Sequence, residues 1–423
     1  MKLNRLLLGG ALLLTHSLSA QQLESSAGVR FQFEAPGARS AAMGGASEAL
    51  TNTFSTNPAA LAHIRQRRIA IDARRTSNST EFITGGTVGA FETISLDAKS
   101  SGIQAATVLL PTRAATFALF VDEPLHTMSP TAGLGSRDQR IEVGLVGQKL
   151  VPISECRQVV NDCNAIGFLD TPVAFRAASR VTLRRIGTAV GFNIGTLSLG
   201  GAVHYAELDQ KSDAYGDSVR GNDRRVTWSG GAQWQISPVI RAGASYRSGA
   251  TFDSTHLRTF PDSDRSETKA ATFRTPTSYG AGIAFDLAPN LTVAVDAQRV
   301  RYSEMIEPHL ALGKSFGIIP LVMPDVTELH AGAEYRIGTR IPVAVRAGWW
   351  RDPSHRLRAI DTTYTGSPGD FFFPAAFINL GLLDEDEDHV TAGIGVGDRL
   401  RLDAAIDKSE HTTRGSLTLA TTF

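Results

Sequence analysis

After its first twenty residues, the sequence contains no long uncharged apolar run. No later stretch reaches the ~18 apolar residues that a transmembrane helix needs, which leaves a soluble exported protein or a β-barrel. The charges are balanced, with 42 Lys and Arg against 42 Asp and Glu in 423 residues. This balance predicts neither nucleic-acid binding nor a polybasic membrane patch.

Cysteine and catalytic motifs are also scarce. The two cysteines, Cys156 and Cys163, lie close together in a polar segment, and in an exported chain this favours a local disulfide. The alternative, a metal site, would need further ligands nearby. The chain has no Gly-x-Ser-x-Gly or His-Glu-x-x-His motif and no phosphate-binding loop. We therefore expect no enzyme, no cofactor and no bound metal, although a hydrolase built from distant strands would leave no local motif.

The first segment has the pattern of a secretory signal. Lys2 and Arg5 precede the apolar run Leu6–Leu14, and small residues at 17–20 predict cleavage after Ala20. A short membrane anchor is the alternative, but the run is too brief to span a bilayer. No cysteine near the cleavage site could carry a lipid. We expect residues 1–20 to be a signal peptide, whose removal leaves a net charge of −2.

The rest of the chain alternates short and long connections. Pairs of alternating apolar and polar segments flank short turns such as Ile194-Gly195-Thr196, Ser237-Pro238-Val239 and Ala288-Pro289-Asn290, and longer polar stretches separate the pairs. This pattern is typical of an outer-membrane β-barrel. It predicts an all-β, monomeric, antiparallel barrel of about fourteen strands over residues 67–423. The predicted strands are Arg68–Thr76, Gly102–Leu110, Ala115–Asp122, Val181–Asn193, Leu197–Leu208, Arg225–Ile236, Ile240–Arg247, Tyr279–Leu287, Leu291–Tyr302, Glu328–Ile337, Val343–Arg351, His389–Val396, Leu400–Lys408 and Gly415–Phe423. Arg140–Leu150 is either a further strand or part of a long loop.

Alternation assigns side chains to the two faces of the wall. In the neighbouring strands 329–337 and 343–350 it places Glu334, Arg336 and Arg346 in the lumen, where they can pair. Facing lipid instead, each charge would cost ~2–4 kcal/mol. The outward aromatic residues predict interfacial girdles, although a soluble periplasmic β-protein could hold them in its core: Tyr205, Trp228, Trp234, Tyr246, Tyr279, Tyr335 and Trp349.

Residues 21–66 are small and rich in Gly and Ala. They are too polar to face lipid, so we expect a plug inside the barrel; a flexible periplasmic tail is the alternative. Gly44-Gly45 and Asn57-Pro58 are the predicted centre of the plug. Arg65, Arg67 and Arg68 are candidates to anchor it to lumen carboxylates such as Asp286, Asp296, Asp403 or Asp407.

Several of these segments resemble the FadL/TodX family of outer-membrane transporters. They are Gly37-Ala38-Arg39, Met43–Ala46, Asn57-Pro58-Ala59, Tyr279–Phe285, Met323–Arg336 and Val345–Asp352, together with an alternating last strand that ends at Phe423. The last strand also resembles the signal that the barrel assembly machinery recognises. The resemblance implies a fourteen-stranded bacterial outer-membrane barrel with a lumenal hatch. It also implies passive transport of fatty-acid-like or other hydrophobic compounds, with sideways exit through the wall. A related barrel type with a similar opening segment serves secretion and surface attachment, so a docking platform is the alternative function.

Two long loops are apolar where loops are usually polar, which marks candidate binding surfaces. We expect them to capture a hydrophobic ligand at the outer face, through Phe316, Ile318, Ile319, Leu321, Phe371, Phe372, Phe373 and Phe377. Alternatively, they pack on each other over the barrel mouth. The acidic run Asp384–Asp388 is either a solvated edge or a cation bridge to lipopolysaccharide. Strand glycines and Pro111 are candidates for a local opening of the wall.

Overall fold

The computed structural model describes part of the chain, and all structural statements below concern these residues. It covers residues 31–423 except 52, 88–89, 147–148, 153–155, 159–166, 215–216, 260–265, 307–320, 339, 356–357 and 360–385.

The described chain forms a closed antiparallel barrel of fourteen strands. Closure comes from β1 (Arg68–Thr87), which pairs with β2 on one side and with the last strand, β19, on the other. Two barrel strands are each divided into consecutive segments: β8 continues into β9, and β10 continues into β11. The remaining wall strands are β2 (Ala90–Pro111), β3 (Ala115–Val146), β5 (Gly167–Ile194), β6 (Leu197–Ala214), β7 (Asp217–Ser237), β8 (Ile240–Arg247), β9 (Ala250–Thr259), β10 (Ser266–Thr275), β11 (Ser278–Ala288), β12 (Leu291–Val300), β14 (Val326–Ile337), β15 (Val343–Asp352), β17 (Glu387–Gly397), β18 (Leu400–Lys408) and β19 (Thr412–Thr422).

All fourteen predicted strand segments overlap a barrel strand, so the predicted count is confirmed. Several predicted strands are shorter than the observed ones, because their hairpins continue past the apolar band. β3 runs through Arg140 to Val146, and the short β4 (Lys149–Pro152) pairs with its end. Another small sheet joins β13 (Leu321–Val322) to β16 (Arg358–Ala359).

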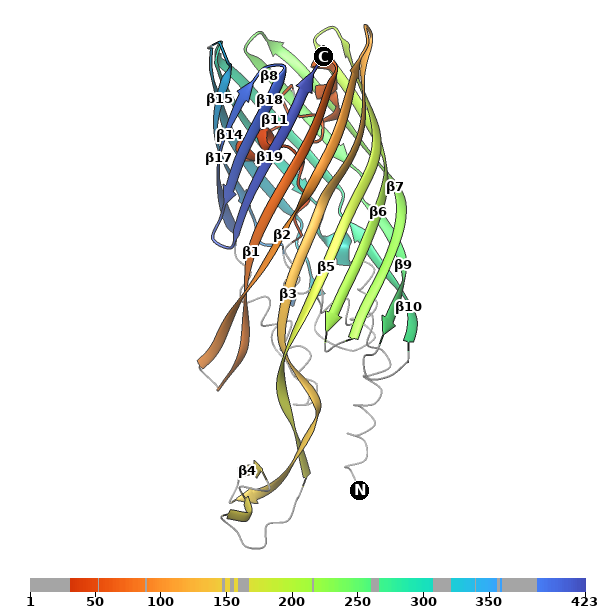
Figure 1. Cartoon of the computed structure of the whole chain (residues 1–423), viewed down its shortest axis with the longest axis vertical. Helices are drawn as coiled ribbons and strands as arrows, with labels where there is room; N and C mark the ends of the chain where they lie inside the picture. Colours follow the sequence, from red (N-terminus) through yellow and green to blue (C-terminus); the bar gives the residue numbers. More distant parts are fainter. Residues whose placement is uncertain are drawn as a thin grey trace.

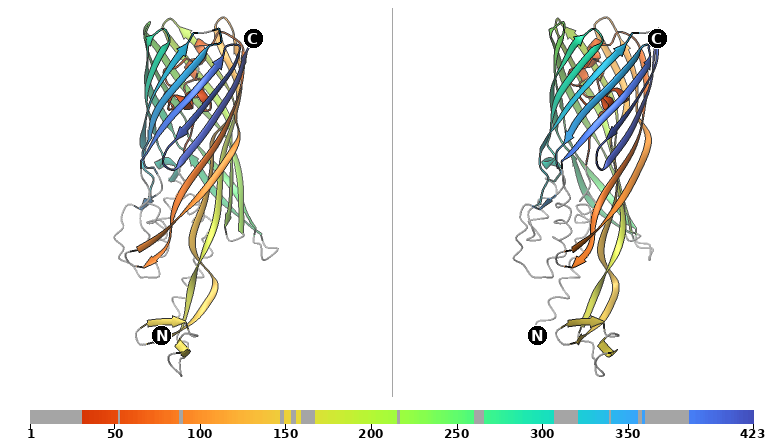
Figure 2. Two further views of the ribbon diagram at one scale, coloured as in Figure 1. Left: turned by 60° about the vertical axis from the view of Figure 1, so that its left-hand side comes forward. Right: turned by 90° about the vertical axis from the view of Figure 1, so that its left-hand side faces the viewer.

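The two ends of the barrel differ (Figure 1). Tight turns such as Gly195-Thr196 close one end, where the C-terminus also lies, and we call it the short-turn end. At the opposite end, the β1–β2 and β3–β5 hairpins project far beyond the wall and separate from each other (Figure 2). In outer-membrane barrels the periplasmic turns are short and the extracellular connections are long, so we expect the short-turn end to face the periplasm.

An apolar band covers the outer face of the barrel. Outward residues such as Val226, Leu329 and Val345 are 69%, 46% and 47% exposed, and the predicted girdle aromatics also point outward. Burying this band in lipid removes the large exposed apolar surface that a soluble protein would carry. In the lumen, Glu334 accepts hydrogen bonds from Arg336 and Arg346, which confirms the predicted pairing.

The N-terminal segment lies inside the barrel, and we call residues 31–66 the plug. It contains one short α-helix, α3 (Ala38–Ala42), and one 3-10 helix, η1 (Pro58–His63). A second short helix, α5 (Ser303–Ile306), follows β12. None of the described helices has the length and apolar character that a membrane crossing requires.

Candidate functional site

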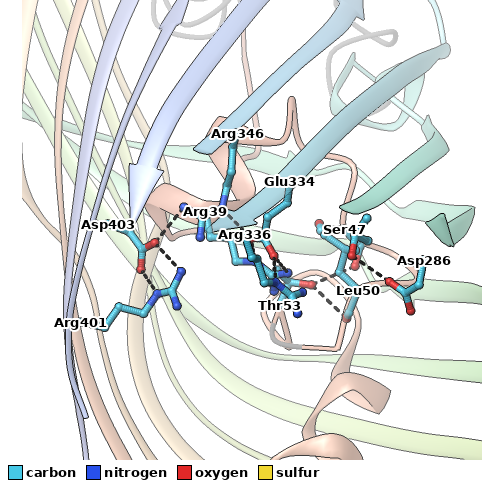
Figure 3. A network of polar contacts seen from close by, with 11 residues as sticks. Arg39, Ser47, Leu50, Thr53, Asp286, Glu334, Arg336, Arg346, Arg401 and Asp403 are labelled. Carbon is cyan, nitrogen blue, oxygen red and sulfur yellow. Dashed lines mark hydrogen bonds and ion pairs between the residues drawn. The ribbon is translucent and has the colours of Figure 1, made fainter. Parts of the chain in front are cut away.

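One side of the plug is held to the wall by a charged network (Figure 3). Arg39 of α3 donates to Glu334 of β14 at 2.8 and 3.1 Å. Arg346 bridges Glu334, at 2.7 Å, to Asp403, at 2.8 Å, and Arg401 completes the set by binding Asp403. Glu334, Arg346 and Asp403 are buried. Burying these charges costs desolvation, so loss of any one partner would leave an uncompensated buried charge, which is strongly destabilising.

The centre of the plug is held by a carboxylate that accepts from its backbone. Asp296 of β12 accepts hydrogen bonds from the Ser47 and Glu48 N–H groups, the latter at 2.8 Å. The Glu48 side chain accepts from Ser245 at 2.7 Å and is 2% exposed. Burial raises the pKa of Glu48 to about 7, because desolvation disfavours its charged form.

Asn57 fixes the next part of the plug. Its side-chain amide donates to the Glu48, Ala232 and Ala244 carbonyls, at 2.9 to 3.2 Å, and its Oδ1 accepts from the Ala59 N–H and so caps η1. Pro58 is the first residue of η1, where its missing N–H has no cost. The Asn-Pro pair therefore joins the plug backbone to two wall strands.

The wall meets the plug through a ring of lumen-facing glycines. A Cβ atom at Gly348 would collide with Gly44 and Met43 of the plug, and at Gly191 it would lie 2.7 Å from the Leu61 Cβ. Gly44 has a φ of +63°, and a Cβ there would lie 2.7 Å from the Trp349 carbonyl oxygen. Backbone can approach backbone this closely only without side chains. The glycines whose added Cβ would meet the plug are Gly191, Gly200, Gly231, Gly243, Gly280, Gly332, Gly348 and Gly393.

On the long-loop side of these contacts, the lumen contains an apolar chamber. Leu125, Leu183, Phe252, Phe273 and Tyr302 of the wall form a buried cluster around Phe31 of the plug, and Phe33 packs against it. The rings of Phe31 and Phe273 lie 5.7 Å apart, and the Tyr302 hydroxyl donates to the Phe31 carbonyl at 2.8 Å. The start of the described plug thus fills a site whose walls suit an apolar ligand.

The side of the plug that faces β1–β6 leaves a cavity of about 350 Å³. Phe54 of the plug and Phe120 of β3 line it, with their rings 5.7 Å apart and edge-on. Asp122 and Arg185 also line it and form a bidentate pair at 2.8 and 2.6 Å. Arg68 and Arg401 bound it toward the short-turn end. This cavity is large enough for a small molecule.

The barrel wall is incomplete beside this cavity. The β2–β3 ladder runs from the pair Pro111 and Thr116, at the short-turn end, to the pair Ala105 and Asp122, where it stops. The β1–β2 and β3–β5 ladders continue far beyond that point. Beside β2 residues 98–104, the neighbouring strand β1 still pairs with β19 on its other edge. No described residue of β3 pairs with this part of β2. We call this unpaired stretch the β2–β3 gap. Ala105 and Asp122, the last pair of the ladder, both line the cavity.

Local chemistry explains where the ladder ends. β3 is irregular between Asp122 and Leu125, and Pro124 at this point has no N–H to donate. On the other edge Gln104 is buried, and both of its side-chain polar atoms lack a partner among the described residues. From inside, the Glu34 N–H of the plug donates to the Pro124 carbonyl at 3.1 Å. The plug therefore lies against the gap.

The predicted plug residues Gly44, Gly45, Asn57 and Pro58 all lie at the plug–wall contact. Of the eight predicted ligand residues, Leu321 begins β13, and the others lie outside the described residues: Phe316, Ile318, Ile319, Phe371, Phe372, Phe373 and Phe377. Cys156 is disulfide-bonded, and Cys163 also lies outside the described residues.

Two expectations were wrong. Arg65 and Arg67 do not anchor the plug, because both are exposed and neither side chain forms a hydrogen bond or ion pair with a described residue. Arg39 has that role instead; its segment Gly37-Ala38-Arg39 was part of the family resemblance, but nothing in it indicated an ion pair with Glu334. Pro111 does not open the wall, since it is paired with Thr116 at the short-turn end. Pro124, and not Pro111, lies where the β2–β3 ladder ends, but it belongs to the segment after Asp122 to which no strand was assigned.

The described residues bring together no group of three His, Cys, Asp or Glu side chains suited to a metal ion. No family model matches the sequence, and no curated protein matches it. Solved structures do match. A FadL homologue of Pseudomonas aeruginosa is 12% identical, with a TM-score of 0.57 over 93% of this chain and 99% of its own.

The chain has the fold of the FadL/TodX channels. The CymD monoaromatic hydrocarbon channel is 12% identical, with a TM-score of 0.54 over 93% of this chain and 99% of its own. The Ralstonia pickettii toluene transporter TbuX is 14% identical, with a TM-score of 0.53 over 92% and 99%. This fold and the lipid-facing band are those of an outer-membrane β-barrel.

Proposed function

We propose that the barrel carries hydrophobic small molecules passively across the outer membrane and releases them sideways through the β2–β3 gap. The observation that supports this most is that the β2–β3 ladder ends at Ala105–Asp122, where the lumenal cavity meets the wall. The names of two solved structures with this fold, a monoaromatic hydrocarbon channel and a toluene transporter, agree with such a substrate class.

Capture takes place at the long-loop end, through the apolar residues of segments 316–321 and 371–377. The ligand then enters the apolar chamber in place of Phe31. Removing apolar surface from water is worth ~25 cal/mol per Å², and this applies equally to the ligand and to the Phe31 side chain. The exchange is therefore close to neutral, as a passive carrier requires.

Exit follows movement of the first plug residues. When Phe31 leaves the chamber, the first plug residues give up the bonds of Tyr302 and His355 to the Phe31 carbonyl and the bond of the Glu34 N–H to Pro124. The ion pairs of Glu34 with Arg74 and Arg414 must also open. Leu125 of the chamber lies directly after the irregular segment of β3, so the route from chamber to gap is short and apolar. The rest of the plug stays on its anchors.

A bulky residue at the end of the ladder tests this route. Ala105 is buried and faces the cavity, whereas Ala106 faces outward. We expect Ala105→Trp to lower uptake of radiolabelled toluene and oleate at least tenfold in cells that carry the barrel, and Ala106→Trp to leave uptake unchanged. Equal uptake by both correctly assembled variants would rule out exit at this gap.

A triple change, Phe371→Ser, Phe372→Ser and Phe373→Ser, tests capture separately. We expect it to raise the ligand concentration needed for half-maximal uptake while the maximal rate stays the same. Unchanged uptake would remove these residues from the mechanism. The alternative function, a docking platform, predicts a sealed lumen, and the 350 Å³ cavity supports transport over it.

A further inference from the structure

The short-turn end carries a one-sided group of arginines. Four neighbouring connections around the rim contribute them: the residues just before β1, the β2–β3 turn, the β14–β15 turn and the β17–β18 turn. Asp398 is the single acidic residue in these connections. The three remaining turns, 194–197, 237–240 and 287–291, carry no charged residue at all. We call the exposed members the arginine arc: Arg65, Arg67, Arg113, Arg340 and Arg399.

Backbone contacts show that the arc is continuous. The Gly397 N–H donates to Pro342 at 3.0 Å, which joins the β14–β15 turn to the β17–β18 turn. The Thr422 N–H donates to Arg399 at 2.8 Å, and the Phe423 N–H donates to Arg67 at 3.1 Å. The β1–β2 register places the β2–β3 turn beside the start of β1.

The arginines of the arc differ from several at the long-loop end. There, Arg184, Arg224 and Arg351 each pair with a carboxylate, at 2.9, 2.8 and 2.6 Å. None of the five arc side chains forms a hydrogen bond or ion pair with another described residue. Five like charges at one rim repel one another, so the arc favours an external anion.

Their surroundings point to a lipid. Exposed apolar side chains at the edge of the lipid-facing band alternate with the arginines: Ile69 (40% exposed), Leu110 (40%), Ile341 (59%) and Leu400 (65%). A guanidinium binds phosphate through two parallel hydrogen bonds, and an adjacent apolar side chain contacts the acyl chain. A basic cluster at the interface of a membrane-spanning protein is a recognised form of anionic lipid site.

We propose that the arginine arc binds the phosphate groups of anionic phospholipids in the periplasmic leaflet. This site is independent of the proposed transport. The five arginines that line the cavity are not part of it: Arg39, Arg68, Arg185, Arg336 and Arg401. The arc would bind anionic phospholipids along one half of the barrel's circumference, the half that includes the junction of β1 and β19.

Native mass spectrometry of the full barrel in detergent tests the proposal, with cardiolipin and phosphatidylglycerol as anionic probes and phosphatidylcholine as the zwitterionic one. We expect tighter binding of the anionic lipids, weakened at least tenfold when all five arc residues are changed to Gln. Changing all five to Lys should preserve part of the binding, because charge remains while the two-pronged geometry is lost.

A matched variant removes five arginines from the long-loop half instead: Arg75, Arg184, Arg224, Arg299 and Arg351, each changed to Gln. It should retain full anionic-lipid binding. Equal loss in both variants would show a general charge effect and overturn the proposal, as would unchanged binding in the arc variant. Tight binding of soluble polyglutamate, with no preference for anionic lipid, would assign the arc to an acidic protein partner instead.

Discussion

The two sides of the plug are built differently. Toward β12–β18, the plug contacts the wall through buried ion pairs, through Asp296 and through close backbone approach. Toward β1–β6 beyond η1, a 350 Å³ cavity separates plug from wall and extends across to the edge of the ion-pair network at Glu334 and Asp403. The wall on this side is also unpaired between β2 and β3. The contrast indicates that one side fixes the plug while the other leaves room for a ligand. A plug held in this way can release its first residues without leaving the barrel.

The largest effect should follow from breaking the fixed side. In Glu334→Gln, Arg39 and Arg346 lose a buried carboxylate, and we expect a loss of about 3–5 kcal/mol in the free energy of unfolding. Guanidinium titration of the purified barrel measures it. Glu207→Gln breaks a solvent-exposed pair with Arg224 and should have a far smaller effect, because water screens the two charges. Similar losses in the two variants would contradict the contrast between the two sides.

The next effect depends on pH. The pKa of Glu48 rises from 4.5 to about 7 in the folded protein. Between these values the folded state keeps a proton that the unfolded state has lost, so stability falls as pH rises. The expected total is about 3 kcal/mol, complete above pH 7. Unfolding at pH 4.5, 6 and 7.5 measures this slope, and Glu48→Gln should flatten it. An unchanged slope in that variant would assign it to other groups.

Asn57→Ala should have a smaller effect of about 2 kcal/mol, because it removes the cap of η1 and the donors to the Ala232 and Ala244 carbonyls. Limited proteolysis should cut the plug faster in this variant while the wall remains intact. Ser55→Ala, two residues away, is the control, because its hydroxyl makes a single long bond, at 3.5 Å, to Pro36. Equal cleavage of the two variants would show that Asn57 is not an anchor.

The smallest expected loss lies on the open side. Phe54→Ala removes a half-buried ring and should cost about 1 kcal/mol. Because the ring lines the cavity, we also expect faster uptake of the toluene probe. Slower uptake would show that Phe54 contacts the ligand productively and does not limit the space available to it.

The sequence was sufficient to predict the wall, because alternation and turn length are local signals that every strand repeats. Glu334, Arg336 and Arg346 were placed in the lumen from their strand faces alone. The plug's position followed from the small, Gly- and Ala-rich composition of its segment, and Gly44 and Asn57 do lie at its contact with the wall.

The site was less accessible to sequence reasoning. The roles of Glu48 and Asp296 depend on residues almost 250 positions apart in the chain, which alternation cannot connect. The β2–β3 gap depends on where a ladder stops, and the charged, proline-containing segment after Asp122 was equally consistent with a loop. The sequence also does not show which carboxylate each arginine contacts, so the anchoring of the plug was assigned to Arg65 and Arg67 and not to Arg39.

The ring of glycines has a consequence for how this protein tolerates substitution. At Gly200, Gly243 and Gly332 the wall meets plug backbone atoms and not plug side chains. Even the smallest addition to these wall positions therefore displaces the plug backbone. A designer who wishes to graft a new plug into this barrel should keep the wall glycines, the path of the plug backbone and its anchors Arg39, Gly44 and Asn57, and has freedom only at the remaining plug positions.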